Sequence, residues 1–143
     1  MYSIAIHGGA GTILRSAMSA EMEKAYRQAL SEALQKGFEI LEAGGSSLDA
    51  ITSAIVSLED NILFNAGRGS VFTNRGEHEM DASVMNGKDL RAGAVAGVQG
   101  IRNPVALAYE VMQRTEHVML SGDGAVEFAA EIGIPLETDE YFY

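Results

Sequence analysis

The chain has no cysteine among its 143 residues. This absence excludes disulfide bonds, thiolate-ligated metal sites and a cysteine nucleophile together, and it is compatible with a reducing cytosol. Intrinsic disorder is disfavoured too, because 47% apolar residues can bury a sizeable core in a chain of this length. The composition therefore predicts one compact domain over residues 1–143.

Basic residues are scarce: 10 Lys and Arg stand against 20 Asp and Glu, which gives a net charge of −10. Such a field repels phosphate backbones and anionic lipid headgroups, so nucleic acid is a disfavoured partner. No run of about eighteen apolar residues occurs, which excludes a membrane-spanning helix. The N-terminal stretch MYSIAIHGG has neither the basic region nor the long apolar core of a signal peptide. We therefore expect a cytoplasmic protein with no membrane partner.

Several familiar functional motifs are missing as well. The glycines of HGGAG, at 7–11, do not continue into the G-x-G-x-x-G fingerprint of dinucleotide-binding proteins. Neither the phosphate-binding G-x-x-x-x-G-K-[ST] nor the nucleophile motif G-x-S-x-G occurs. The histidines, His7, His78 and His117, form no short metal-ligand pair. Taken alone, His7 is expected to be a satisfied core imidazole, and residues 77–79 a solvated edge.

The first half of the sequence contains three periodic segments. Alternating residues 2–6 predict a buried strand that ends in a glycine turn. Helical spacing over 22–41 predicts a long amphipathic helix, which Gly44 and Gly45 stop. A second helix follows with its apolar stripe over 48–58, capped by Ser46 or Ser47.

The second half predicts a hairpin, a helix, a strand and a last helix. Residues 80–85 and 92–98 flank an Asn-Gly turn and should pair as antiparallel strands. Asn103 and Pro104 predict a helix start, 117–120 a strand, and Asp123 the beginning of the last helix. This order predicts an α+β fold with a mostly antiparallel sheet covered by helices, rather than a repeated βαβ winding. The small side chains of AGAVAGV indicate that another element packs very closely against that strand.

Two glycine-rich loops are the unusual features of the sequence: HGGAG at 7–11 and FNAGRGS at 64–70. A loop of this kind can approach an anion with bare N–H groups, hold a cation with bare carbonyls, or simply turn. The residues alone leave these three alternatives open and show no complete catalytic set.

Seven segments in order resemble the first, α, chain of the plant-type asparaginase or isoaspartyl aminopeptidase family of Ntn (N-terminal nucleophile) hydrolases. They are IAIHGGAG (4–11), LEAGGSSLDA (41–50), SLEDNILFNAGRGSVFT (57–73), MDASVMNG (80–87), AGAVAGV (92–98), RNPVALA (102–108) and HVMLSGDGA (117–125). Each segment is a weak signal alone, but the ordered set covers nearly the whole chain.

The resemblance implies that a precursor cuts itself before a Thr, which becomes the N-terminal nucleophile of a second, β, chain and uses its own α-amino group as base. The present chain would then be the α subunit, part of an αββα sandwich that the second chain completes. The implied activity is hydrolysis of L-asparagine to L-aspartate and ammonia, and cleavage of β-aspartyl dipeptides. The implied assembly is an (αβ)2 heterotetramer without an organic cofactor.

The resemblance also assigns residues of this chain. It implies a structural sodium ion held by the main-chain carbonyls of Leu58, Glu59, Asn61, Phe64, Ala66 and Arg68. Asn65 would lie close to the nucleophilic Thr of the partner chain and help to orient it. His7, Gly8 and Gly9 would form the glycine turn that shapes the cleavage site.

Two features depart from the family pattern. Ile62 stands where many relatives have Pro, so the sodium loop is expected to be less rigid. The chain ends at Tyr143 rather than at the Gly of a cleavage junction, so we expect that a C-terminal linker is missing. Two other functions stay open: a hydrolase of glycosylated asparagine, against which the missing signal peptide counts, and a stand-alone small-molecule binding module.

Overall fold

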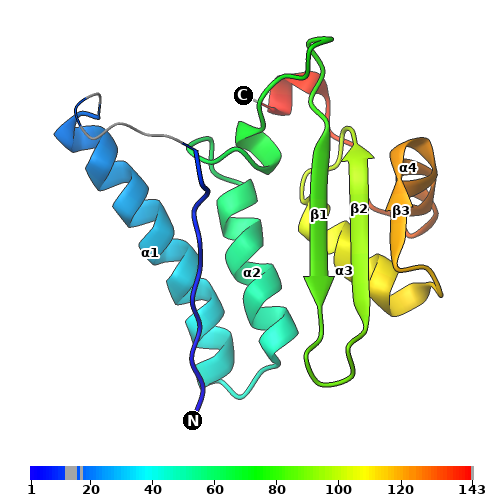
Figure 1. The fold of residues 1–143 in the computed structure, drawn as a ribbon, viewed down its shortest axis with the longest axis horizontal. Helices are drawn as coiled ribbons and strands as arrows, with labels where there is room; N and C mark the ends of the chain where they lie inside the picture. The colour runs from blue at the N-terminus through cyan, green and yellow to red at the C-terminus, as the bar shows by residue number, and fades with distance from the viewer. Residues whose placement is uncertain (12–15, 17, 143) are drawn as a thin grey trace.

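The computed structural model describes residues 1–11, 16 and 18–142. Tyr143, the residue at which the sequence departs from the family's cleavage junction, lies outside the described residues. The described residues form an α+β arrangement of four α-helices, one three-stranded sheet and two short 3-10 helices (Figure 1). In chain order these are α1 (Ala20–Glu42), α2 (Ser47–Glu59), η2 (Gly67–Gly69), β1 (Met80–Met85), β2 (Ala92–Val98), α3 (Pro104–Arg114), β3 (Met119–Ser121), α4 (Gly122–Glu131) and η3 (Asp139–Tyr141).

Helices α1 and α2 form an antiparallel pair, and both begin where the sequence predicts. Ser19 caps α1 by accepting a hydrogen bond from the Met22 N–H, and Ser46 caps α2 in the same way. The turn between them contains Gly44, whose φ of +82° favours glycine. At the crossing, a Cβ on Gly37 would lie 2.8 Å from the Ala50 carbonyl oxygen, so a glycine is needed for the helices to approach this closely.

The predicted hairpin is confirmed, because β1 and β2 pair antiparallel with Met80 opposite Val98. Strand β3, however, pairs parallel to β2, with Leu120 opposite Val95. The expectation of a mostly antiparallel sheet is therefore only half right. The parallel pairing arises because α3 crosses over the sheet between β2 and β3, so the chain returns in the same direction as β2 (Figure 1).

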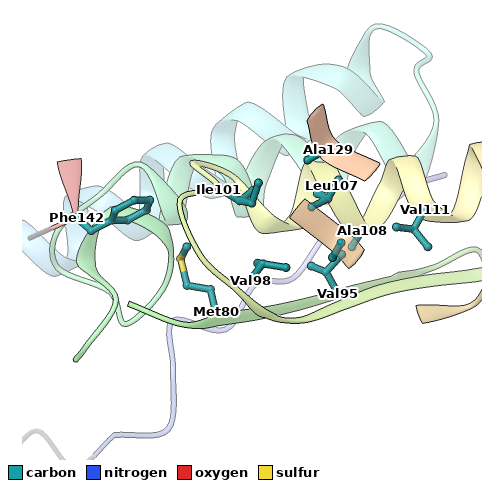
Figure 2. Packing of buried hydrophobic residues seen from close by; sticks show 10 residues of the cluster. Met80, Val95, Val98, Ile101, Leu107, Ala108, Val111, Ala129 and Phe142 are labelled. Atoms are coloured by element: carbon teal, nitrogen blue, oxygen red, sulfur yellow. The ribbon is translucent and has the colours of Figure 1, made fainter. Parts of the chain in front are cut away.

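Helix α3 is the element that packs closely on the AGAVAGV strand, as predicted. A Cβ on Gly93 would meet the Ala108 carbonyl oxygen and would lie 2.6 Å from the Met112 nitrogen. Figure 2 shows the core that results, in which side chains from β1, β2, α3 and α4 meet Ile101 and Phe142, the residue after η3. Its labelled members are Met80, Val95, Val98, Ile101, Leu107, Ala108, Val111, Ala129 and Phe142.

Helices cover one face of the sheet. On β1 the buried side chains, Met80 and Val84, face α3, whereas Asp81, Ser83 and Met85 are exposed. In the part of the chain that the structure describes, no second sheet covers this other face (Figure 1). None of the described helices is long and apolar enough to span a membrane.

The prediction of a buried N-terminal strand is wrong. Residues 1–11 form no strand, and Tyr2 is exposed. The segment runs extended along α1 and α2, where it buries parts of Ile4 and Ile6 (Figure 1). Because a strand needs a neighbour for its backbone hydrogen bonds, and none of the described strands lies beside residues 1–11, the alternation of the sequence produces an extended segment without a ladder.

Candidate active site

The two glycine-rich loops meet at one open cavity of about 540 Å³. Residues 7–11 form one wall, and residues 64–66, from the loop after α2, form another. Tyr26 of α1, Ile55 and Leu58 of α2, and Leu63 of the loop after α2 complete the lining. The structure thus brings together the four residues that the sequence predicts as supporting groups: His7, Gly8, Gly9 and Asn65.

The wall at residues 7–11 is exposed and held by few contacts. His7 is exposed, and its Nδ1 accepts a hydrogen bond of 3.1 Å from the Gly9 N–H. The interpretation of His7 as a core imidazole is therefore wrong, because the preceding segment does not enter a sheet. Gly9 has a φ of +114°, a conformation that side chains with a Cβ disfavour. Gly8 lets the segment lie on α1, since its Cβ would be 2.8 Å from Cδ2 of Leu30.

Asn65 lines the cavity, and the oxygen of its side-chain amide already accepts a hydrogen bond. Its Oδ1 accepts a hydrogen bond of 3.0 Å from the Val71 N–H, which fixes the side chain across the loop. The amide therefore presents its Nδ2 as the group that can donate to a ligand. No serine, threonine or cysteine belongs to the lining that the described residues provide. The described lining can bind and orient a polar group, but it offers no nucleophile of these types.

The glycines of the second loop are required by close backbone contacts. A Cβ on Gly67 would lie 2.7 Å from Cβ of Glu59 and would meet the Glu59 carbonyl oxygen. A Cβ on Gly69 would meet the Phe64 carbonyl oxygen and would lie 2.7 Å from that of Ile62. Close packing alone thus accounts for both glycines, as the simple-turn alternative requires. The same packing places several backbone carbonyl oxygens around the two glycines.

The carbonyl oxygens predicted as cation ligands differ in their hydrogen bonding. Four of them accept one backbone N–H each: Leu58 from Asn61, Asn61 from Phe64, Phe64 from Ala66 and Ala66 from Gly69. Within the described residues, those of Glu59 and Arg68 accept none. Because each carbonyl oxygen has two lone pairs, all six retain the capacity to coordinate a cation. Hard oxygen donors of this kind fit a hard cation such as sodium.

Glu59 adds a buried carboxyl group to the same loop. It is 3% exposed, and its Oε1 accepts a hydrogen bond of 2.9 Å from the Val105 N–H in the first turn of α3. Its Oε2 has no hydrogen-bond partner among the described residues. Burial raises the pKa of Glu59 to about 7, although the hydrogen bonds from Val105 and Asn103 act in the opposite direction.

Asp60, the next residue, caps the C-terminal end of α2. Its Oδ1 accepts hydrogen bonds from Arg102 Nε at 3.1 Å, Asn103 Nδ2 at 3.2 Å and the Tyr141 hydroxyl at 3.2 Å. Burial alone would raise the pKa of Asp60, but the hydrogen bonds and the charge of Arg102 outweigh it and hold the pKa below its ordinary value. Sequence analysis missed this cluster, because its members are 42 to 81 residues apart from Asp60.

The interpretation of residues 77–79 as a solvated edge is wrong for the middle residue. His78 is 7% exposed, its Nδ1 lies 3.1 Å from Ser70 Oγ, and its ring is 4.3 Å from that of Phe72. Glu77 and Glu79 are exposed, as predicted. Buried and exposed side chains alternate from His78 through Met80 into β1. This alternation was the signal in the sequence that could have predicted the burial of His78.

A sequence model of the protein family described as "Asparaginase" matches residues 1–143. The chain belongs to this asparaginase family. It is 52% identical over 139 residues to a protein named isoaspartyl peptidase from Salmonella typhimurium, covering 97% of this chain and 44% of that protein. It is 51% identical over 139 residues to an isoaspartyl peptidase from Escherichia coli (97% and 43%) and 49% identical over 135 residues to a plant-type L-asparaginase from Pyrococcus abyssi (94% and 43%).

These comparisons confirm the resemblance drawn from the seven ordered segments. The asparaginase-family chain spans less than half the length of the curated relatives it matches. The parts of those proteins that lie beyond the match have no counterpart among the 143 residues.

Proposed function

We propose that this chain is the α subunit of an amidohydrolase that converts L-asparagine to L-aspartate and ammonia and cleaves β-aspartyl dipeptides. The observation that carries the proposal is the cavity shared by residues 7–11 and 64–66, which positions polar groups but has no serine, threonine or cysteine in its described lining. A second chain has to supply the nucleophile. Membership of the family, with relatives named isoaspartyl peptidase and L-asparaginase, supports this division of labour.

In the proposed mechanism, the N-terminal Thr of the β chain attacks the side-chain amide carbon of asparagine. Its α-amino group accepts the hydroxyl proton and passes it to the amide nitrogen. The C–N bond then breaks, ammonia leaves, and a β-aspartyl ester forms on the Thr. Water then hydrolyses this ester and releases aspartate. Asn65 of the present chain would orient the Thr through its Nδ2, because its Oδ1 is held by Val71. His7, Gly8 and Gly9 would form the wall against which the second chain lies.

The structural sodium ion belongs to the same proposal. The carbonyl oxygens of Leu58, Glu59, Asn61, Phe64, Ala66 and Arg68 would hold it. Their hard-donor chemistry and the close packing at Gly67 and Gly69 support this assignment. A cation there would fix the loop that carries Asn65, so its role would be to order the cavity rather than to act on the substrate.

The second chain would also complete the fold. The exposed face of the sheet, with Ser83 and Met85 of β1 and Met119 of β3, would pack against a second sheet in an αββα sandwich. Two such pairs would form the (αβ)2 heterotetramer. The cytoplasmic location stays a prediction from the sequence.

The test is to purify the complete protein that contains this chain and to measure ammonia release from L-asparagine and aspartate release from β-aspartyl dipeptides. We expect both activities, and their loss when the partner Thr is replaced by Ala. Absence of both activities in the correctly assembled protein would contradict the proposal. Hydrolysis of glycosylated asparagine alone would favour the other hydrolase that the sequence left open.

A further inference from the structure

Tyr141 contacts both ends of the loop that runs from Glu59 to Arg68. Its hydroxyl donates a hydrogen bond of 3.2 Å to Asp60 Oδ1, at the start of the loop. The guanidinium of Arg68, at the end of the loop, lies over its ring at 5.6 Å from the centroid. Figure 1 shows η3, in red, at the same end of the molecule as the segment that follows α2. One aromatic side chain from the last turn of the described chain therefore bridges a loop more than seventy positions earlier in the sequence.

The contact with Asp60 is part of a larger set of donors. Arg102 donates to the same Oδ1, and its guanidinium also lies over the Tyr141 ring, 5.2 Å from the centroid. Each guanidinium is attracted electrostatically to the face of the ring. The segment before α3, the C-terminal end of α2 and η3 are thus joined at one carboxylate.

The segment that carries Tyr141 is itself firmly attached. Phe142, the next residue, is 1% exposed and belongs to the core between the sheet and α3 (Figure 2). Its ring lies 5.7 Å from that of His78, which in turn contacts Ser70 just beyond the loop. Tyr141 is therefore presented to the loop from a rigid base.

The loop has a particular need for an outside support. Asp60 lies between two of the predicted cation ligands, Glu59 and Asn61. Arg68 is the last residue of the predicted ligand set. Tyr141 therefore contacts one residue that adjoins two ligands and one ligand residue directly. Ile62 leaves the loop without the fixed φ that a proline would impose. A loop that is held in its binding conformation before the cation arrives loses less conformational entropy on binding.

We propose that Tyr141 is a positioning residue that fixes the two ends of the 59–68 loop and so strengthens its affinity for the cation. This inference rests on the sodium site of the proposed function. It concerns the Tyr141 hydroxyl and ring, and neither group coordinates the cation.

The test measures sodium binding by the complete assembled protein through its thermal stability. Melting curves are recorded at increasing NaCl, with choline chloride keeping the ionic strength constant. Because the stabilisation by sodium follows RT ln(1 + [Na+]/Kd), the curves give the dissociation constant Kd for sodium. We expect Tyr141→Phe, which removes only the hydroxyl, to raise this Kd about threefold, and Tyr141→Leu, which also removes the ring, about tenfold. Tyr109→Phe is the matched control and should leave it unchanged, because this half-buried tyrosine packs on another cluster.

A double-mutant cycle covers the case in which Tyr141→Leu does not fold. Asp60→Ala and Tyr141→Phe remove the two sides of one hydrogen bond, so their effects on the logarithm of the sodium Kd should be clearly less than additive. Full additivity would overturn the proposal. So would an equal loss of melting temperature at zero and at high sodium with an unchanged sodium Kd, because Tyr141 would then support the fold alone.

The outcome can be separated from the proposed activity. A wild-type protein that sodium does not stabilise beyond choline would overturn the inference, whatever its hydrolase activity. A protein that shows the expected sodium shifts and releases no ammonia from asparagine would instead contradict the proposed function and leave the role of Tyr141 supported.

Discussion

The two glycine-rich loops line the same cavity, but they use glycine for different reasons. At 64–70 a Cβ on Gly67 would collide with the carbonyl oxygen of Glu59 at the end of α2, and a Cβ on Gly69 with that of Phe64 in the loop. At 7–11 nothing within 4 Å would meet a Cβ on Gly9 or Gly11 in the described structure. The shape of the 64–70 loop is therefore determined by close contacts within the chain. The 7–11 loop is an open wall with free space beside it.

This difference shows that similar composition does not imply a similar role. The 64–70 loop is dense with internal contacts, so its glycines serve the fold and its carbonyls are held in fixed places. The open space at 7–11 matches a surface that another molecule has to approach, as the proposed second chain would. Substitutions in the two loops should therefore separate stability from activity.

The largest effect is expected for Gly67→Ala and Gly69→Ala. Each new methyl group would press on backbone that cannot move aside, and Gly67 also has a φ of +51°. We expect each change to lower the free energy of unfolding by about 3 kcal/mol or more. Chemical denaturation of the complete protein measures this. A loss below about 1 kcal/mol for both would remove the distinction between the loops.

The next largest loss of stability is expected for Asp60→Asn. This change weakens the hydrogen bonds by which Asp60 holds the chain just before the 64–70 loop. We expect a loss of about 1 kcal/mol at neutral pH, because three donors lose their charged acceptor. Since the pKa of Asp60 in the folded protein lies below its ordinary value, its contribution is present above pH 3.8 and is lost as the pH falls through the lowered pKa.

The difference between wild type and Asp60→Asn should therefore shrink in acid. Denaturation curves of the two proteins at neutral pH and at a pH well below 3.8 check this sign. A difference that grows toward acid pH would contradict the assigned hydrogen bonds.

A smaller effect is expected for Gly8→Ala, at the point where the open loop touches α1. The added methyl group would meet Cδ2 of Leu30, the flexible end of a side chain, at 2.8 Å. Leu30 can rotate away, so we expect a loss of about 0.5–1 kcal/mol. Thermal denaturation next to Gly69→Ala provides the comparison, and an equally large loss for both variants would speak against an open wall.

The smallest effect on stability is expected for Gly11→Ala. Among the described residues no atom within 4 Å opposes the methyl group, so the free energy of unfolding should change by less than about 0.5 kcal/mol. Because Gly11 lines the cavity, asparagine hydrolysis should fall by a larger factor than stability predicts. Unchanged kcat and KM would show that the 7–11 wall does not contact the reacting partners.

Local signals made much of this fold predictable. Caps such as Ser19 and Ser46, the Asn-Gly turn between β1 and β2, and Pro104 at the start of α3 act over a few residues, and the sequence displays them directly. The failures all involve distant partners. The direction of β3 depends on the path of α3, and the state of residues 2–6 depends on which strand lies beside them.

The candidate site follows the same rule. His7, Gly8, Gly9 and Asn65 were named through the family resemblance, and the structure places them together at the cavity. The Asp60 cluster was not predicted, because it joins three parts of the chain through side chains that no local pattern connects. The burial of His78 was within reach of the period of two, but its acidic neighbours favoured an exposed segment.

The most direct test of the account is to locate the covalent intermediate. The complete protein is treated with an electrophilic analogue of asparagine and digested, and mass spectrometry identifies the modified residue. We predict that the label is on the N-terminal Thr of the second chain and that residues 1–143 carry none. A label on a residue of this chain, such as Ser70, would contradict the claim that the chain supplies the cavity and its partner the nucleophile.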